Sequence, residues 1–201
     1  MLERRQVTPM TELKWLGLSR RASIVAALAF VYLVWGSTYF VLAVGVREVP
    51  PFLFAGARFL LAAALMAVVA LVRREAWPDA RAWLRGAAVG GLLFVVGNGG
   101  VTWAEQEVSS GLTAVIVASM PIWLALFAAA AGERPSRREA VGLVLGMAGV
   151  MVLQLGRALG GSSTAAAVLF VSPIGWALGS YWARRWTLAS GAVGMVTQML
   201  P

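Results

Sequence analysis

Residues 24–46 read IVAALAFVYLVWGSTYFVLAVGV, an apolar stretch of 23 residues without a charged side chain. An α-helix rises 1.5 Å per residue, so about 20 such residues cross the roughly 30 Å hydrocarbon core of a membrane. Similar stretches recur along the chain, and this recurrence decides the fold class. The others lie at Phe52–Val72, Gly86–Trp103, Gly111–Ala131, Ala140–Leu155 and Ala165–Ala183, and a seventh begins near Ala192.

The composition of the chain places these stretches in lipid. Hydrophobic residues make up 60% of the 201 residues and charged residues 13%, against about 45–50% and 25% in globular proteins. Backbone groups in lipid must find their hydrogen bonds within the segment, which favours helices. Uninterrupted apolar runs such as residues 60–71 also lack the alternation of a membrane β-barrel. We therefore expect an all-α fold, a polytopic transmembrane helix bundle.

Two residue types are missing from the sequence. Without cysteine the chain has no disulfide, thiolate nucleophile or thiolate metal site, and without histidine it has no imidazole ligand or base. Integral-membrane enzymes usually depend on such groups or on clustered acids. The sequence accordingly predicts no enzyme activity, no metal site and no cofactor.

The positive charges lie between the apolar stretches and alternate sides. With the N-terminus in the cytoplasm, fourteen of the seventeen cations face the cytoplasm, as the positive-inside rule requires. The net charge of +8 therefore marks a membrane face, and we expect no nucleic-acid partner. The fourteen are Arg4, Arg5, Lys14, Arg20, Arg21, Arg73, Arg74, Arg81, Arg85, Arg134, Arg137, Arg138, Arg184 and Arg185.

The order of the stretches predicts four parts. Residues 1–23 form a basic cytoplasmic tail, residues 24–155 a unit of five helices, residues 156–164 a Gly/Ser/Thr-rich linker, and residues 165–201 the start of a second unit. Because five is odd, a second unit enters the membrane from the opposite side. Such inverted repeats build the two alternating states of many secondary transporters.

Short motifs within the first unit resemble a known family. Trp35-Gly36-Ser37-Thr38-Tyr39, Pro51 with Arg58, Gly97-Asn98-Gly99 and Pro121-Ile122-Trp123 follow one another in the order and spacing of EamA-type permeases of the drug/metabolite transporter superfamily. The resemblance implies an inverted five-helix repeat topology, here with an incomplete second repeat. It implies a permease or exporter of small metabolites or drug-like molecules that works by alternating access in the cell (inner) membrane, in contact with the lipid bilayer and a small-molecule substrate.

The same resemblance leaves alternatives open, because members of that family resemble a ten-helix protein and this sequence ends at the seventh stretch. The chain is then an inactive fragment of a ten-helix permease or a non-transporting membrane subunit or scaffold. Otherwise it assembles as a homodimer or with a partner half-transporter.

Two polar residues within the predicted spans are candidate site residues. Arg58 carries the one formal charge inside a predicted span, at a cost of about 2.5–3.5 kcal/mol on insertion scales. It either lines the substrate pathway or holds helices together. Asn98 lies among glycines, which predicts either a local break that exposes the backbone or a hydrogen bond between helices.

The other candidate functional residues are aromatic residues, prolines and two glutamates. Trp35, Tyr39 and Trp123 could stack on a substrate in the pathway, or could anchor their helices at the interface. Pro121 and Pro173 are hinge candidates, because proline removes a helix hydrogen bond. Glu105 and Glu107 follow the third span and are interpreted as solvated loop acids, although any proton carrier in this part of the chain would have to be one of them.

Overall fold

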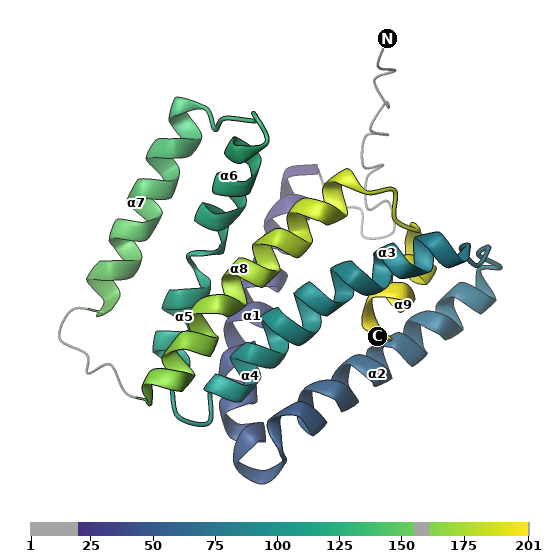
Figure 1. Ribbon diagram of the computed structural model, residues 1–201, viewed down its shortest axis with the longest axis horizontal. Coiled ribbons are helices and arrows are strands. Elements are labelled where there is room, and N and C mark those ends of the chain that lie inside the picture. The colour runs from purple at the N-terminus through teal and green to yellow at the C-terminus, as the bar shows by residue number, and fades with distance from the viewer. Residues whose placement is uncertain (1–19, 155–160, 201) are drawn as a thin grey trace. The chain divides into compact units, whose positions relative to one another are not determined.

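The computed structural model describes residues 20–154 and 161–200, and every regular element in these residues is helical (Figure 1). The predicted all-α fold is thus confirmed. The elements are α1 (Arg20–Glu48), α2 (Pro51–Val72), α3 (Ala80–Gly90), the π-helix η2 (Gly91–Gly99), α4 (Gly100–Ala104), α5 (Ser110–Val117), α6 (Met120–Ala130), α7 (Arg137–Gln154), α8 (Ser163–Arg185) and α9 (Gly191–Met199).

Five helical segments in the described part of the chain are long and apolar enough to cross a membrane. They coincide with the predicted first, second, third, fourth and sixth spans, and the segments are Arg21–Glu48, Pro51–Val72, Ala80–Ala104, Ser110–Ala130 and Ser163–Arg185. The remaining long helix, α7, has 18 residues and covers the predicted fifth span as far as Gln154. Its first turn is charged, with Arg137, Arg138 and Glu139, so its apolar part is shorter than in the other five. The chain is a polytopic membrane protein.

Some sequence-based boundaries lie outside the described residues. The predicted basic tail covers residues 1–23, of which only residues 20–23 are described, and these already belong to α1. Residue 155 and residues 156–160 of the predicted linker are likewise not described, and the linker's last two residues, Ser163 and Thr164, begin α8. The seventh stretch is helical as α9.

The chain divides into two compact units, residues 1–40 and residues 41–201. In the first unit, the hydroxyls of Ser37 and Thr38 donate hydrogen bonds to the carbonyl of Val34, at 3.0 and 2.8 Å. The hydroxyls of Ser37 and Thr38 are therefore satisfied within their own helix, which suits a helix that crosses lipid.

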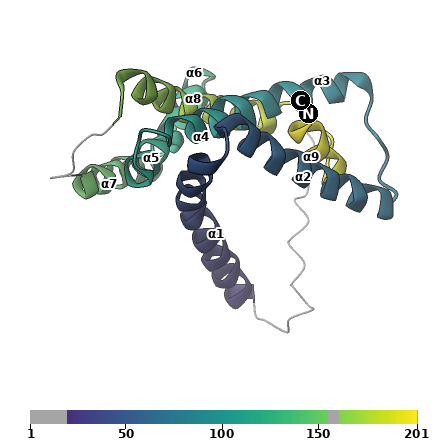
Figure 2. The ribbon, with the colours of Figure 1, turned by 90° about the horizontal axis from the view of Figure 1, so that it is seen from below.

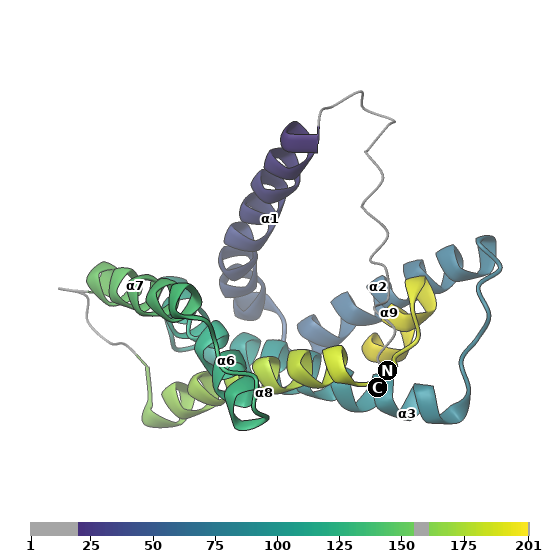
Figure 3. The ribbon, with the colours of Figure 1, turned by 90° about the horizontal axis from the view of Figure 1, so that it is seen from above.

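In the second unit, α8 is the central helix. It packs against η2 and α4 on one side and against α5 and α6 on the other, and Figure 2 shows it running beside α4 and α6. The last helix, α9, packs against α2 and α3 (Figure 3). Ala70 of α2 forms a buried cluster there with Ala192 and Val193 of α9.

Glycines set how closely these helices approach. A Cβ atom on Gly175 of α8 would overlap the side chain of Val96 in η2. On the other side of the bundle, Gly86 and Gly90 of α3 lie directly against Thr197 and Gln198 of α9. Small residues at helix contacts let backbones approach in lipid, where the hydrophobic effect does not hold helices together.

Contacts between helix ends define which ends share a face of the bundle. Glu75, after α2, accepts a hydrogen bond of 3.0 Å from the backbone N–H of Val193 at the start of α9. Arg185 at the end of α8 forms an ion pair with Glu133 after α6. These contacts, with the alternating direction of the helices, bring the arginine-rich connections to one end. That this end is cytoplasmic stays a prediction.

The contact between α3 and α9 generates a stability prediction. Gly90→Ala places a methyl group against the backbone carbonyl of Gln198, which cannot rotate away as a side chain can. We expect the free energy of unfolding to fall by about 1–3 kcal/mol, as for other overpacked sites. Thermal unfolding in detergent, followed by tryptophan fluorescence, measures this.

The matched control is Gly142→Ala in α7. A Cβ atom at that residue would lie more than 4 Å from every described atom outside the adjacent turns of its own helix. It should leave the unfolding midpoint unchanged or raise it slightly, since alanine favours helix over glycine. Equal midpoints for the two variants would contradict the proposed packing of α3 on α9.

Candidate functional site

Arg58 lies on α2, seven residues after its first residue Pro51, and its side chain is half-buried. Its guanidinium carbon lies 5.9 Å from the ring centre of Phe54 and 5.4 Å from that of Phe59. Aromatic faces attract cations through their quadrupole, most strongly where water is excluded. Within the described residues, no carboxylate lies at ion-pair distance from Arg58. Its charge is therefore offset by the aromatic rings of its own helix.

The aromatic contact continues from α2 into the third span. The rings of Phe59 and Phe94 lie 4.5 Å apart, which joins α2 to η2. Asn98 follows Phe94 by one helical turn, so Arg58 and Asn98 lie on neighbouring helices. The structure thus brings two of the five predicted pathway residues onto one helix pair.

At Asn98 the third span widens and does not break. Residues 91–99 form a π-helix, which continues into α4. The side-chain amide of Asn98 donates to the carbonyl of Leu93 at 3.1 Å, and the hydroxyl of Thr102 donates to the carbonyl of Asn98 at 2.7 Å. The third span is thus not broken at Asn98. The described hydrogen bonds of Asn98 lie within its own span, and none of them joins two helices. π-Helical turns are frequent at functional sites.

The three aromatic candidates are not gathered at this helix pair. Trp123 lies on α6, and its ring meets that of Phe170 of α8 edge-on at 5.6 Å. It therefore contacts α8, the helix that packs against η2. Trp35 and Tyr39 belong to the first unit, on the same helical turns as Ser37 and Thr38, and are placed only within that unit.

The two hinge candidates differ in their local structure. The fourth span is interrupted between Val117 and Met120, and Pro121 takes the second position of α6, where a missing N–H removes no helix hydrogen bond. Pro173 is buried inside α8, which runs through it without interruption. A role as hinge stays a prediction for both.

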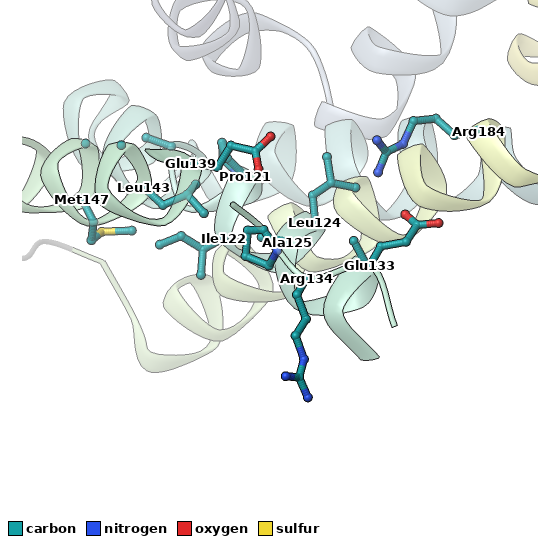
Figure 4. Close-up of a pocket in the computed structure, with 15 residues that line it drawn as sticks. Pro121, Ile122, Leu124, Ala125, Glu133, Arg134, Glu139, Leu143, Met147 and Arg184 are labelled. Carbon is teal, nitrogen blue, oxygen red and sulfur yellow. The ribbon is translucent and has the colours of Figure 1, made fainter. Parts of the chain in front are cut away.

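A cavity of about 580 Å³ lies between α6 and α7 (Figure 4). Figure 4 shows Ile122 and Ala125 of α6 on one side and Leu143 and Met147 of α7 on the other. This cavity was not predicted from the sequence. Its sequence signal is Gly142 and Gly146, whose positions on α7 have no neighbour within 4 Å in the described structure.

Charged side chains close the end of that cavity where α6 ends and α7 begins: Glu133, Arg134, Glu139 and Arg184. Ser136 and Glu139 form a capping box, in which the backbone N–H of Ser136 donates to Glu139 at 2.7 Å and the N–H of Glu139 donates to the Ser136 hydroxyl at 3.3 Å. The backbone and side-chain hydrogen bonds of Ser136 lower the pKa of Glu139. The cavity is thus apolar along the helices and ionic at its mouth.

Glu105 differs most from its sequence-based interpretation. The prediction of a solvated loop acid is wrong for this residue, whose side chain is 5% exposed directly after α4, with both carboxylate oxygens covered and without a hydrogen-bond partner. Burial raises the pKa of Glu105 from 4.5 to about 8. A sequence pattern cannot reveal this burial, because the burial of a residue after a helix end depends on how the helices pack.

The same prediction is confirmed for Glu107, which is exposed. Its carboxylate accepts a hydrogen bond of 2.9 Å from the backbone N–H of Ser162, the residue that caps α8. Hydrogen bonds from the side chain and backbone of Ser162 lower the pKa of Glu107. Two glutamates only two residues apart therefore have opposite environments.

Comparison with known proteins agrees with this helical architecture. The model of the EamA-like transporter family matches residues 22–155. The chain belongs to this family. The matched part contains Arg58, Asn98, Trp123 and Glu105, whereas Pro173 lies beyond it.

Curated relatives extend the likeness toward the C-terminus. The EamA-family chain is 40% identical over 178 residues to the uncharacterized inner membrane transporter YedA of Escherichia coli K12, a match that covers 88% of this chain and 58% of YedA. It is 28% identical over 132 residues to the uncharacterized transporter YoaV of Bacillus subtilis, which covers 65% of this chain and 45% of YoaV. The chain thus spans about half the length of these relatives. No solved structure matches it.

The burial of Glu105 generates a prediction about pH. Because its pKa in the folded protein is raised above the ordinary value of 4.5, the folded state holds a proton that the unfolded state has released. The free energy of unfolding should therefore fall as the pH rises from 4.5 to about 8. Thermal unfolding midpoints across this range measure the effect.

Glu105→Gln keeps the shape of the protonated side chain but cannot ionise, so its midpoint should depend less on pH than that of the wild type. Glu107→Gln is the matched control, because the pKa of Glu107 is lowered and its titration lies below this range. A Glu105→Gln profile parallel to the wild type would contradict a raised pKa.

Proposed function

We propose that this chain is part of an inner-membrane transporter that moves small metabolites or drug-like molecules across the bilayer. The match of residues 22–155 to the EamA-like transporter family carries this proposal. The name of YedA as an inner membrane transporter supports the location. Transport is also consistent with a chain that offers neither cysteine nor histidine for catalysis.

The proposed pathway is lined by Trp35, Tyr39, Arg58, Asn98 and Trp123. Support is strongest for Arg58, because its guanidinium lies against aromatic rings and none of the described hydrogen bonds uses its N–H groups. A guanidinium has five donors in a fixed fork, which suits a planar polar group of a substrate. Asn98, on the neighbouring helix, contributes the widened turn beside it.

The proposed mechanism is alternating access, in which one five-helix repeat moves against a second repeat. Helix interruptions and π-turns are points where helices bend. The interruption after Val117, the π-helix at residues 91–99 and Pro173 in α8 supply three such points. The predicted second repeat begins with α8 and α9. It is completed on the same chain, in a homodimer or by a partner half-transporter.

The proposed orientation places the N-terminus in the cytoplasm, and the absence of native cysteine makes it testable. Gln106→Cys and Arg134→Cys each create one exposed thiol, at opposite ends of the bundle. A membrane-impermeant maleimide added to intact cells should label Gln106→Cys and leave Arg134→Cys unlabelled until the cells are broken. The reverse labelling pattern would mean that the N-terminus lies outside.

Transport itself is tested with proteoliposomes that contain the wild type, Arg58→Ala or Arg58→Lys, loaded with a panel of radiolabelled metabolites. Loss of a charged hydrogen-bonding group costs about 1.5–3 kcal/mol, so Arg58→Ala should lower flux by about tenfold or more. Arg58→Lys keeps the charge without the fork and should give intermediate flux.

Arg81→Ala is the matched control for these measurements, because Arg81 is an exposed arginine near the start of α3 and should not affect flux. Wild-type flux equal to that of protein-free vesicles would overturn the transport proposal. Equal flux in the wild type and in Arg58→Ala would remove Arg58 from the pathway.

A further inference from the structure

The connection between α4 and α5 contains a buried acid that the proposed pathway does not use. Glu105 is 5% exposed, and neither carboxylate oxygen has a hydrogen-bond partner. An isolated buried carboxylate is strongly unfavourable, so a group in this position either binds a cation or takes up a proton. Thr113, one turn into α5 on the other side of the same connection, is also fully buried, and its hydroxyl has no partner.

Beside this connection lies a cavity of about 620 Å³. One wall comes from the last turns of α1, with Ala43, Val46 and Arg47, and the other from residues 105–110. The cavity is lined in good part by polar groups of the connection, so water can occupy it. Glu105 belongs to the lining, but its two oxygens are covered in this conformation.

The charged groups around Glu105 come from few elements. From α1, Arg47 lines the cavity and the exposed Glu48 follows it. From the connection, Glu107 is exposed and bound to Ser162. The first turns of α2, α5 and α8 carry no acidic side chain, and the nearest charge on α2 is Arg58, about 10 Å along the helix from its start. Among the described residues, none forms an ion pair with Glu105.

We propose that Glu105 is a proton-binding site, and that its ionisation opens the α4–α5 connection toward this cavity. The protonated carboxyl is uncharged and stays buried at the end of α4. When a carboxylate oxygen gives its proton to water in the cavity, the resulting anion must reach that water or the guanidinium of Arg47. Residues 105–110 then move, and Thr113 becomes hydrated.

The electrostatics support this assignment, because burial raises the pKa of Glu105 to about 8. Near neutral pH the site thus holds its proton, and a modest change in surroundings releases it. The inference rests on the proposed function in one respect: in a transporter, this end of the bundle must open and close, and proton binding would control that step.

Proton binding is tested without any transported solute. Infrared difference spectroscopy of the purified chain in lipid follows the carbonyl stretch of protonated carboxyl groups between pH 5 and 10. The wild type should lose one such band with a midpoint near 8. Glu105→Gln should lack this change, and Glu107→Gln should keep it.

These outcomes decide the proton site whether or not the chain transports. A wild type without a carboxyl that titrates above pH 6 would overturn the proposal, even if a variant failed to fold. The same titration in Glu105→Gln would also overturn it. Failure of solute flux in proteoliposomes would instead count against the proposed function and leave the proton site standing.

Opening of the connection is tested by hydrogen–deuterium exchange of residues 105–113, with intrinsic exchange rates corrected for pH. Between pH 6 and 9, exchange should rise at least tenfold in the wild type and in Glu107→Gln. In Glu105→Gln it should stay at the low value that the wild type shows at pH 6. Equal exchange in the wild type and in Glu105→Gln at pH 9 would contradict the opening step.

Discussion

The structure depends on one constraint: in lipid, each backbone N–H and C=O must find its partner inside the protein. The polar side chains of the spans obey the same constraint. Thr38, Thr102 and Ser172 each donate to the carbonyl four residues earlier, so their hydroxyls do not compete for partners outside the helix. Even at the interruption of the fourth span, the hydroxyl of Ser119 donates to the carbonyl of Ile116 at 2.6 Å.

When the polar groups of a helix are already hydrogen-bonded within that helix, few of them are left to bind a neighbouring helix. Their association then rests on close approach at glycines and on a few contacts between helix ends. Gly100 and Gly175 bring α8 against the third span, and Gly86 and Gly90 bring α9 against α3. Glu75 and Glu107 bind the first backbone N–H groups of later helices, where the helix dipole favours a negative charge.

The sequence predicts the spans well because their signal is local: an apolar stretch of the right length must be a helix in lipid, whatever it packs against. It also predicts that the arginine-rich connections after α2, α6 and α8 share one end of the bundle. It does not predict the π-helix at residues 91–99, because a widened turn depends on how η2 fits against α8. Nor does it predict the cavity between α6 and α7, since that depends on where α7 fails to reach its neighbours. That Trp35, Tyr39 and Trp123 line one pathway with Arg58 stays a prediction.

Arg58 and Glu105 represent two answers to the same problem, a titratable group away from water. Arginine cannot release its proton in a protein, so its charge must be offset in place, here by the rings of Phe54 and Phe59. A glutamate can become neutral, which makes it tolerable behind α4 without a partner. Both lie toward the same end of the bundle, because α2 begins where α4 ends. If Glu105 holds a proton, the positive charge of Arg58 is not offset by it and the proposed pathway is positive at this end. If Glu105 is ionised, its negative charge offsets that potential, so proton binding would change both the shape and the electrostatic preference of the pathway.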